Sequence, residues 1–594
     1  MMPGQYLVLA GRRARGAAEE MIARSVVLAP DLITIHATPT CLIMADPLLP
    51  HALLQGGRGA IMGRLHGPDE AGFSSDRTMT CPGWQGAVRD NWGDFIVLEQ
   101  GDDGQDIQVA RSAMGGLPCY HIVHDGLVVL SNAPRLIAAV TTRLTIDLEA
   151  LMHHMLCITA RGPRTCLLGL CELEAGYWLT LGQSGPAARP FWDPWRHAGR
   201  TGQRKDIARC APVVRERVLD ATRRTVSGHR HILLGLSGGL DSSILAASLD
   251  AAQVDFSCFT LVTPDGAGDE RRYARMVARH LGRELHEIEE CSSDIDIAHS
   301  AAAHLPRPVA RCFAQSGDRI QMALASRLGA DAYMSGGGGD NIFCYVHSAR
   351  PLADRLLSQG PGRGAWQTAR DIALLTDSPQ WKVMMTGIGR SLWGSRDYRW
   401  SLDRQYLSPG AADIVAAALT HDWMRAPIGE LPGKAQHIAW ILGVLNHVEG
   451  FERERSLPTL WPLLAQPLVE TCLSIPTWAW LGGGQNRVIA REAFADLLPP
   501  DIVGRRSKGS PDSFVITLFE EKKAQIATFL CEGWLAQQGL IDTDAIARRC
   551  SQDWIHRDAS CWKLFGLVDA ESWARSWLDS QRYAPAAVGQ VHRS

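Results

Sequence analysis

The segment LLGLSGGLDSSILAA, residues 233–247, decides the fold class of this 594-residue chain. A short apolar run is followed by the turn Ser237-Gly238-Gly239 and then by a helical pattern that opens at Asp241. A short buried strand, a glycine turn and a helix begin a βαβ unit. Because the N–H groups of such a turn and of the helix N-terminus point into the same space, we predict a binding site for an anion here.

The flanking residues continue this pattern. Between about residues 230 and 345, short β-prone runs alternate with helical runs, which implies a parallel sheet with right-handed crossovers. Residues 346–594 have mostly helical patterns, so we predict one domain over 206–594 with an α/β core and a helical extension. Residues 1–190 contain short β-prone runs divided by Gly, Pro, Asp and Asn, which predicts a β-rich sandwich domain. The Pro-, Gly- and charge-containing residues 191–205 are predicted to be a linker.

Composition excludes several function classes. The 60 basic residues do not outnumber the 63 acidic ones, so the charge gives no reason to expect a nucleic-acid partner. No apolar run reaches the roughly 18–20 residues that a membrane span needs, and the N-terminal residues lack the order of a secretory signal. The 15 cysteines include no Cys-x-x-Cys pair. We expect a cytoplasmic protein with reduced thiols and no membrane partner.

The first glycine turn has the chemistry of a phosphate site. Glycine lets the backbone approach phosphate oxygens, serine hydroxyls add donors, and the Asp241 carboxylate is suited to hold Mg²⁺ against those oxygens. The Walker pattern GxxxxGK[ST] does not occur, so a pyrophosphate site on ATP fits better than phosphoryl transfer. The alternative is a capped helix start without a ligand. The predicted phosphate-binding residues are Leu236, Ser237, Gly238, Gly239, Asp241 and Ser242.

A second glycine turn lies in YMSGGGGDNIF, residues 333–343. It follows another predicted strand, and the carboxyl ends of parallel strands meet at one edge of the sheet. We therefore predict that Gly336, Gly337 and Gly338 lie beside the nucleotide and that Asp340 is the second Mg²⁺ carboxylate, facing Asp241. The alternative is that Asp340 is an ordinary turn residue.

Several segments resemble the asparagine-synthetase-like ATP pyrophosphatases. They are LSGGLDSS, DERRYARMVARHLG, SGGGGDN, PLLAQPLVETCLSIP and LPPDIVGRRSKGS. QVARSAMGGLPCYH and VLSNAPRLIAAV resemble core strands of the same family's N-terminal glutaminase-type (Ntn) domain. An active glutaminase of that family exposes Cys directly after the initiator Met, whereas Met2 stands here and the first cysteine is Cys41. The resemblance thus implies an Ntn-type sandwich that lacks its nucleophile, and nitrogen from another source.

A finer resemblance points to lasso peptide cyclases of the microcin J25 type. It is carried by SGGGGDNIF, by RRSKGS and by QPLVETCLSIPTWAWLGGGQNRVIAREAF. Gly337 stands where asparagine synthetases carry Glu and β-lactam synthetases Tyr, and we expect the missing side chain to leave room for a peptide. The resemblance implies that ATP adenylates an Asp or Glu side chain of a precursor peptide, whose N-terminal amine then closes a macrolactam ring. Implied partners are this precursor, a leader peptidase and a leader-binding protein.

The resemblance also assigns roles to individual residues. Lys508 is expected at the α-phosphate and the acyl-adenylate, with a solvated lysine in a basic loop as the alternative. Backbone atoms of Leu261 and Val262 are expected near the adenine ring. Glu449 and His447 are the candidates for the base that assists the amine, with a structural role as the alternative for each. The rival functions are asparagine synthetase-like amidation of a free amino acid with ammonia, a tRNA-modifying pyrophosphatase and a scaffold without catalysis.

Overall fold

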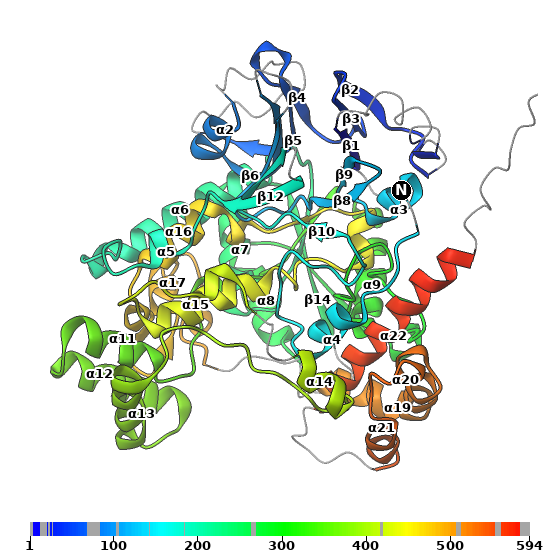
Figure 1. The fold of residues 1–594 in the computed structure, drawn as a ribbon. Helices are drawn as coiled ribbons and strands as arrows, with labels where there is room; N and C mark the ends of the chain where they lie inside the picture. The colour runs from blue at the N-terminus through cyan, green and yellow to red at the C-terminus, as the bar shows by residue number, and fades with distance from the viewer. Residues whose placement is uncertain are drawn as a thin grey trace, which may run out of the picture.

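The computed structural model contains two six-stranded antiparallel sheets, one five-stranded parallel sheet and many helices (Figure 1). A two-stranded antiparallel sheet is formed by β18 (Leu481–Gly482) and β19 (Gln485–Asn486). Among the described helices, none has the length and apolarity required to cross a bilayer. The described residues are 4–11, 21, 24–25, 28–67, 83–101, 106–141, 143–182, 185–262, 269–415, 420–506, 512–552 and 560–582.

The N-terminal part is a pair of facing six-stranded antiparallel sheets, which confirms the β-rich prediction for this region. Alternate residues such as Val8, Ile43 and Leu98 form the core between the sheets. The first sheet has the order β10-β8-β9-β1-β3-β2, with β1 (Tyr6–Ala10), β2 (Ile33–Ala37), β3 (Cys41–Ala45), β8 (Tyr120–His124), β9 (Leu127–Ser131) and β10 (Cys171–Glu172). The second has the order β12-β11-β7-β6-β5-β4, with β4 (His51–Leu53), β5 (Gly59–His66), β6 (Trp92–Gln100), β7 (Ile107–Arg111), β11 (Tyr177–Gly182) and β12 (Gly185–Pro190).

Helices cover the outer faces of both sheets, so this part is layered rather than a bare sandwich. Phe95 and Val97 of β6 pack outward against α2 (Trp84–Asp90). Leu7 and Leu9 of β1 lie in one cluster with residues of α3 (Pro134–Val140) and α4 (Leu148–Leu156). Central strands such as β1 and β6 therefore bury side chains on both faces, whereas the edge strands β2 and β12 are largely exposed.

The parallel sheet carries the turns singled out in the sequence. Its order is β15-β14-β13-β16-β17, and every neighbouring pair is parallel, which confirms the βαβ prediction. The order reverses at β13, and ligands of such sheets bind where the order reverses. The strands are β13 (Ile232–Gly235), β14 (Phe256–Val262), β15 (Leu285–Glu289), β16 (Ala332–Met334) and β17 (Thr459–Leu460). Helices α6 (Cys210–Thr225), α7 (Leu240–Ala251), α8 (Arg271–His280) and α9 (Gln315–Leu328) flank them.

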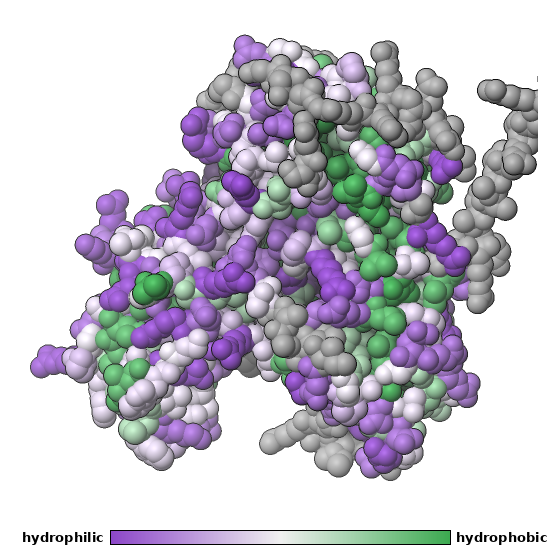
Figure 2. All heavy atoms as spheres, in the orientation of Figure 1, coloured by the Kyte–Doolittle hydropathy of each residue, from purple (hydrophilic) through white to green (hydrophobic). Residues whose placement is uncertain are grey.

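The rest of the chain is mostly helical, as expected. Figure 1 places α11, α12 and α13 in a lobe away from the sheets, and Figure 2 shows some hydrophobic side chains on its surface. Trp366, Trp381 and Trp393 of these helices are exposed. The helices are α10 (Gly339–Ile342), α11 (Arg350–Gln359), α12 (Arg363–Thr376), α13 (Gln380–Trp393), α14 (Pro409–Val415), α15 (Pro432–Val444), α16 (Gln466–Ser474), α17 (Val488–Ala493), α18 (Pro500–Val503), α19 (Asp512–Cys531), α20 (Trp534–Gln537), α21 (Thr543–Cys550) and α22 (Ser560–Arg582).

Residues 191–205 are packed rather than extended between domains. They contain the short helix α5 (Trp195–Ala198), and both Trp192 and Trp195 are buried in the core of the parallel-sheet domain. The indole N–H of Trp195 donates to the carbonyl oxygen of Trp423 at 2.8 Å. The segment therefore fixes the β layers to the second domain.

A buried ion cluster joins the two parts of the chain. The Glu172 carboxylate, 1% exposed, pairs with Arg111 and Arg161 at 2.7 Å and with Arg307 at 2.5 Å. Arg161 also pairs with Glu449 at 2.6 Å. Burial alone raises a carboxyl pKa, but the surrounding guanidinium groups hold the pKa of Glu172 well below its usual value. Glu172 is therefore ionised throughout the neutral range.

Glu172→Gln is expected to lower the free energy of unfolding by about 3–5 kcal/mol, because it leaves buried guanidinium groups without their counter-charge. The lowered pKa stabilises the folded state above the unfolded-state value of about 4.3, and this stabilisation is lost as the pH falls below it. Urea unfolding at pH 7 and pH 4 measures both effects. Glu149→Gln, whose exposed pair with Arg164 spans 3.0 Å, is the control and should change stability by less than about 1 kcal/mol. Equal effects of the two substitutions would contradict the prediction.

Candidate active site

The turn between β13 and α7 has the conformation that a phosphate cradle requires. Gly238 has φ +67°, and a Cβ atom there would lie 2.4 Å from the backbone carbonyl carbon of Tyr273. Gly239 is the N-cap residue of α7 and leaves the first N–H groups of the helix without a side-chain cap. Such N–H groups and the positive end of the helix dipole favour an anion.

The serine hydroxyls stabilise this turn. The Ser243 and Ser242 hydroxyls donate to the Gly239 carbonyl oxygen at 2.8 and 3.2 Å. The Ser237 hydroxyl oxygen accepts from the Gly239 N–H at 3.2 Å. The predicted serines therefore shape the cradle as well as being available to a ligand.

The second glycine turn packs directly on the first. A Cβ atom on Gly336 would lie 2.7 Å from the Ser242 nitrogen, and one on Gly339 would lie 2.3 Å from the Asp241 carboxyl carbon. Only glycine permits this approach. The four glycines thus bring Asp340, in the first turn of α10, next to Asp241.

The expectation that Gly337 leaves open space is wrong for this structure. A Cβ atom on Gly337 would lie 2.2 Å from the indole ring of Trp461. Gly338 has φ +86°, and its Cβ would lie 2.7 Å from the Leu464 side chain. The volume of the missing side chain is therefore filled by Trp461, from a segment more than a hundred residues away.

Arg487 holds the two carboxylates together. Its Nη1 atom lies 3.0 and 2.9 Å from the Asp241 oxygens and 2.6 Å from the nearer Asp340 oxygen. Burial lowers the pKa of a guanidinium, but Asp241 and Asp340 outweigh this and raise the pKa of Arg487. Arg487 also has φ +55°, a left-handed conformation that costs a non-glycine residue of order 1 kcal/mol. The surrounding contacts compensate for that strain.

The two carboxylates fit a shared cation. Both reach a single nitrogen atom within 3.0 Å, so their oxygens can converge on one metal ion. The described residues contain no cluster of three His, Cys, Asp or Glu that could hold a metal. Mg²⁺ bound by Asp241 and Asp340 would thus complete its coordination with phosphate oxygens and water, and would neutralise charge on a pyrophosphate leaving group. The ion and the Arg487 guanidinium cannot occupy the same point.

A cavity of about 480 Å³ lies over these groups. Most residues predicted to bind ATP line it: Leu236, Ser237, Gly239, Asp241, Ser242, Leu261, Gly336, Gly337, Gly338 and Asp340. Gly238 is not among the residues that line the cavity. Its carbonyl oxygen accepts a hydrogen bond from Arg505 at 3.0 Å. Val262 is buried, and its carbonyl oxygen accepts from the Glu290 N–H at 3.1 Å. Lys508 lies outside the described residues.

The sequence interpretation missed three polar residues of this cavity. Burial raises the pKa of Glu290 to about 7, and a buried oxygen of Gln321 has no hydrogen-bond partner. Both line the cavity together with Leu261, the residue expected near adenine, so they are available to polar groups of the base. Arg505 pairs with Glu270 at 2.7 Å. Of these, Glu290 follows strand β15 directly, and that position at a strand end was the available signal.

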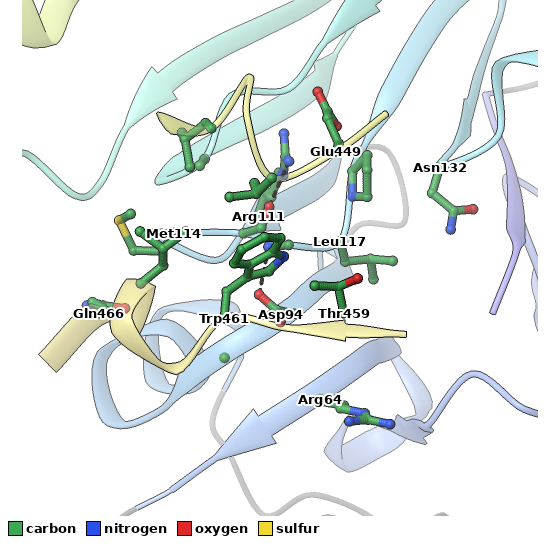
Figure 3. A pocket seen from close by; sticks show the side chains of 18 of the residues that line it. Arg64, Asp94, Arg111, Met114, Leu117, Asn132, Glu449, Thr459, Trp461 and Gln466 are labelled. Carbon is green, nitrogen blue, oxygen red and sulfur yellow. Dashed lines mark hydrogen bonds between the residues drawn. The ribbon is translucent and has the colours of Figure 1, made fainter. Parts of the chain in front are cut away.

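The two candidate bases lie away from the ATP cavity. Glu449 lines a second cavity, of about 370 Å³, between the N-terminal sheets and the parallel-sheet domain (Figure 3). Its carboxylate is paired with Arg161 at 2.6 Å. The Nδ1 atom of His447 accepts from Arg311, and burial together with Arg311 lowers the pKa of His447 to about 4. Both groups are already engaged in structural contacts.

Comparison with known proteins identifies the family. The model of the family described as "Asparagine synthase" matches residues 213–575, and the chain belongs to that family. This match confirms the predicted family. Members of the family are ATP-dependent, AMP-forming amide ligases. No curated protein matches the sequence.

Solved structures give only a weak likeness. A glutamine phosphoribosylpyrophosphate amidotransferase from B. subtilis, complexed with ADP and GMP, is 11% identical over 50% of this chain and 83% of that chain, with a TM-score of 0.20. A structure described as the allosteric regulatory enzyme of purine biosynthesis has the same identity and TM-score over 50% of this chain and 82% of its own. Likenesses with this identity and TM-score do not establish a shared fold.

Gly339→Ala is expected to weaken binding of ATP with Mg²⁺ by about tenfold or more, because its Cβ would displace the Asp241 carboxylate. Isothermal titration calorimetry measures the affinity. Gly389→Ala in helix α13 is the matched control, since nothing lies within 4 Å of its Cβ, and it should leave the affinity unchanged. Unchanged affinity of Gly339→Ala would show that the contact with Asp241 is unimportant.

Proposed function

We propose that this chain forms the macrolactam bond of a lasso peptide, using ATP and Mg²⁺. One observation carries the proposal: the segments that resemble lasso peptide cyclases supply the centre of the ATP cavity. SGGGGDNIF contributes Gly336, Gly337, Gly338 and Asp340, and QNRVIAREAF contributes Arg487, which contacts both acids. The membership in a family of AMP-forming amide ligases supplies the reaction class.

In the first step, an Asp or Glu side chain of the precursor attacks the α-phosphorus of ATP, and pyrophosphate leaves. Negative charge grows on the leaving group. The N–H groups at the start of α7 and the Arg487 and Arg505 guanidinium groups are placed to stabilise that charge. Arg505 is already oriented by Glu270, whereas Arg487 must leave the point between Asp241 and Asp340 when Mg²⁺ binds there.

In the second step, the N-terminal amine of the same peptide attacks the acyl-adenylate, and AMP leaves. Holding amine and acyl group in one bound molecule converts an encounter of two reactants into an internal step. We place the reaction in the cytoplasm, with the precursor, a leader peptidase and a leader-binding protein as partners.

The test is incubation of the protein with ATP, Mg²⁺ and a candidate leaderless precursor. We expect AMP and pyrophosphate, together with a peptide lighter by one water. Asp241→Asn should reduce both by about 10²-fold or more, because it removes a charge that orients Arg487 and would hold Mg²⁺. Mass spectrometry and nucleotide chromatography measure the products. Release of ADP, or absence of the dehydrated peptide, would reject the proposal.

Asparagine synthetase-like amidation is the second candidate, because the family match over residues 213–575 fits it equally. Aspartate, ammonium and ATP should then give asparagine and AMP. We expect no asparagine above the background of the Asp241→Asn variant. Amino-acid analysis of the same preparation that cyclises the peptide distinguishes the two activities.

A further inference from the structure

Helix α13 has an apolar stripe on the face that the rest of the chain leaves exposed. Trp381, Met385 and Leu392 are 70%, 64% and 64% exposed, and the half-buried Ile388 lies between the last two. The four positions are separated by four, three and four residues, so they follow one line along the helix over about 16 Å. Single exposed apolar side chains are common, whereas a continuous line of them indicates a contact surface.

The opposite face of α13 is firmly packed. Val383 is buried in one cluster with Leu352 of α11. A Cβ atom on Gly387 would lie 2.5 Å from the Leu352 side chain, so the two helices approach each other closely at this glycine. Figure 1 shows α13 at the end of its lobe that is farthest from the antiparallel sheets. The helix is therefore held by one face and presents its apolar stripe outward.

The stripe is complementary to itself. Its spacing of four, three and four residues is the same in both directions of the chain. When two copies of α13 are placed antiparallel about a twofold axis at the centre of the stripe, Trp381 of one protomer faces Leu392 of the other, and Met385 faces Ile388. Every apolar position thus meets another apolar position, as the symmetric interface of a homodimer requires.

The charges of α13 are compatible with this antiparallel arrangement. The charged residues of the helix are Lys382 and Arg390, and of these Lys382 is exposed. Antiparallel pairing places Lys382 opposite Ser391, so the two ammonium groups are separated by nine residues, or about 13 Å, along the axis. This separation exceeds the Debye length of about 8 Å at physiological salt. Parallel pairing would instead bring the two lysines side by side.

The exposed area is close to what a dimer needs. A covered aromatic side chain buries about 150–250 Å², so Trp381 and Trp393, which are 70% and 82% exposed, offer roughly 300 Å² per protomer. Met385 and Leu392 add to this area. The lower limit for a specific interface is about 600 Å² per protomer. The face therefore fits a dimer that dissociates in the micromolar range instead of a permanent one.

We propose that this protein forms a homodimer in solution in which the two copies of α13 pair antiparallel through their apolar stripes. A lipid surface has no twofold symmetry, and it gives no reason for the match between the two halves of the stripe. The inference concerns assembly and does not depend on the proposed peptide chemistry.

Sedimentation velocity of the full chain at about 1–100 µM measures the association. We expect the sedimentation coefficient to rise with concentration from that of a monomer toward that of a dimer. Trp381→Glu should weaken association by about 10²-fold or more, because each dimer loses two tryptophan contacts and gains two charges at its centre. Leu168→Glu, at a 60% exposed site in the N-terminal part, is the matched control and should leave association unchanged. Thermal melting confirms that the variants are folded.

A pair of opposite charges tests the register. Leu392→Lys alone should also weaken the dimer. Trp381→Glu combined with Leu392→Lys in the same chain should recover about tenfold of the lost affinity at low salt and less at high salt, because each carboxylate then faces an ammonium group of the other protomer. The two sites are about 16 Å apart within one helix, so the introduced charges cannot pair inside a protomer.

Three results would overturn the proposal. The first is a monomer at every concentration, and the second is unchanged association of Trp381→Glu. The third is a combined variant that associates no better than the single ones. Vesicles of phosphatidylglycerol and phosphatidylcholine are the comparison surface. Co-sedimentation of a monomeric protein with them, lost in Trp381→Glu, would assign the stripe to a lipid surface instead.

Discussion

The contact of Arg487 with Asp241 and Asp340 is the interaction on which the site depends. Two carboxylates this close repel each other unless a cation lies between them. The guanidinium supplies that charge, and the glycines at 336 and 339 supply the space for the approach. A metal ion with bound phosphates would neutralise the two carboxylates in place of the guanidinium. The loops after β13 and β16 are thus organised for a nucleotide before one binds.

A second constraint fixes the N-terminal sheets on the parallel-sheet domain. Glu172 and its arginines lie between the two parts, and Arg161 extends this cluster to Glu449. A hydrophobic cluster adds to it, because residues from Leu7 in β1 to Trp577 in α22 belong to one core. One hydrophobic cluster and one ion cluster therefore cross the boundary predicted near residue 190.

These two constraints give the protein two cavities with a common wall. One has the acids, the helix N-terminus and the guanidinium groups suited to ATP, while the other lies between the N-terminal sheets and the parallel-sheet domain. Trp461 is central to this arrangement, since it fills the space over Gly337 and lines the second cavity.

The sequence by itself determined the βαβ core, the two glycine turns and the pair Asp241 and Asp340, because local patterns and the carboxyl-end rule are enough to place them. Tertiary structure alone decided what surrounds them. Arg487 contacts Asp241 across 246 residues, and the two-residue strand β17 is too short to leave a periodic signal. The same holds for Glu449, whose carboxylate is paired with Arg161, a residue 288 positions away in the sequence. Burial and distant partners set the chemistry of a carboxyl group, and neither can be inferred from the residues next to it in the sequence.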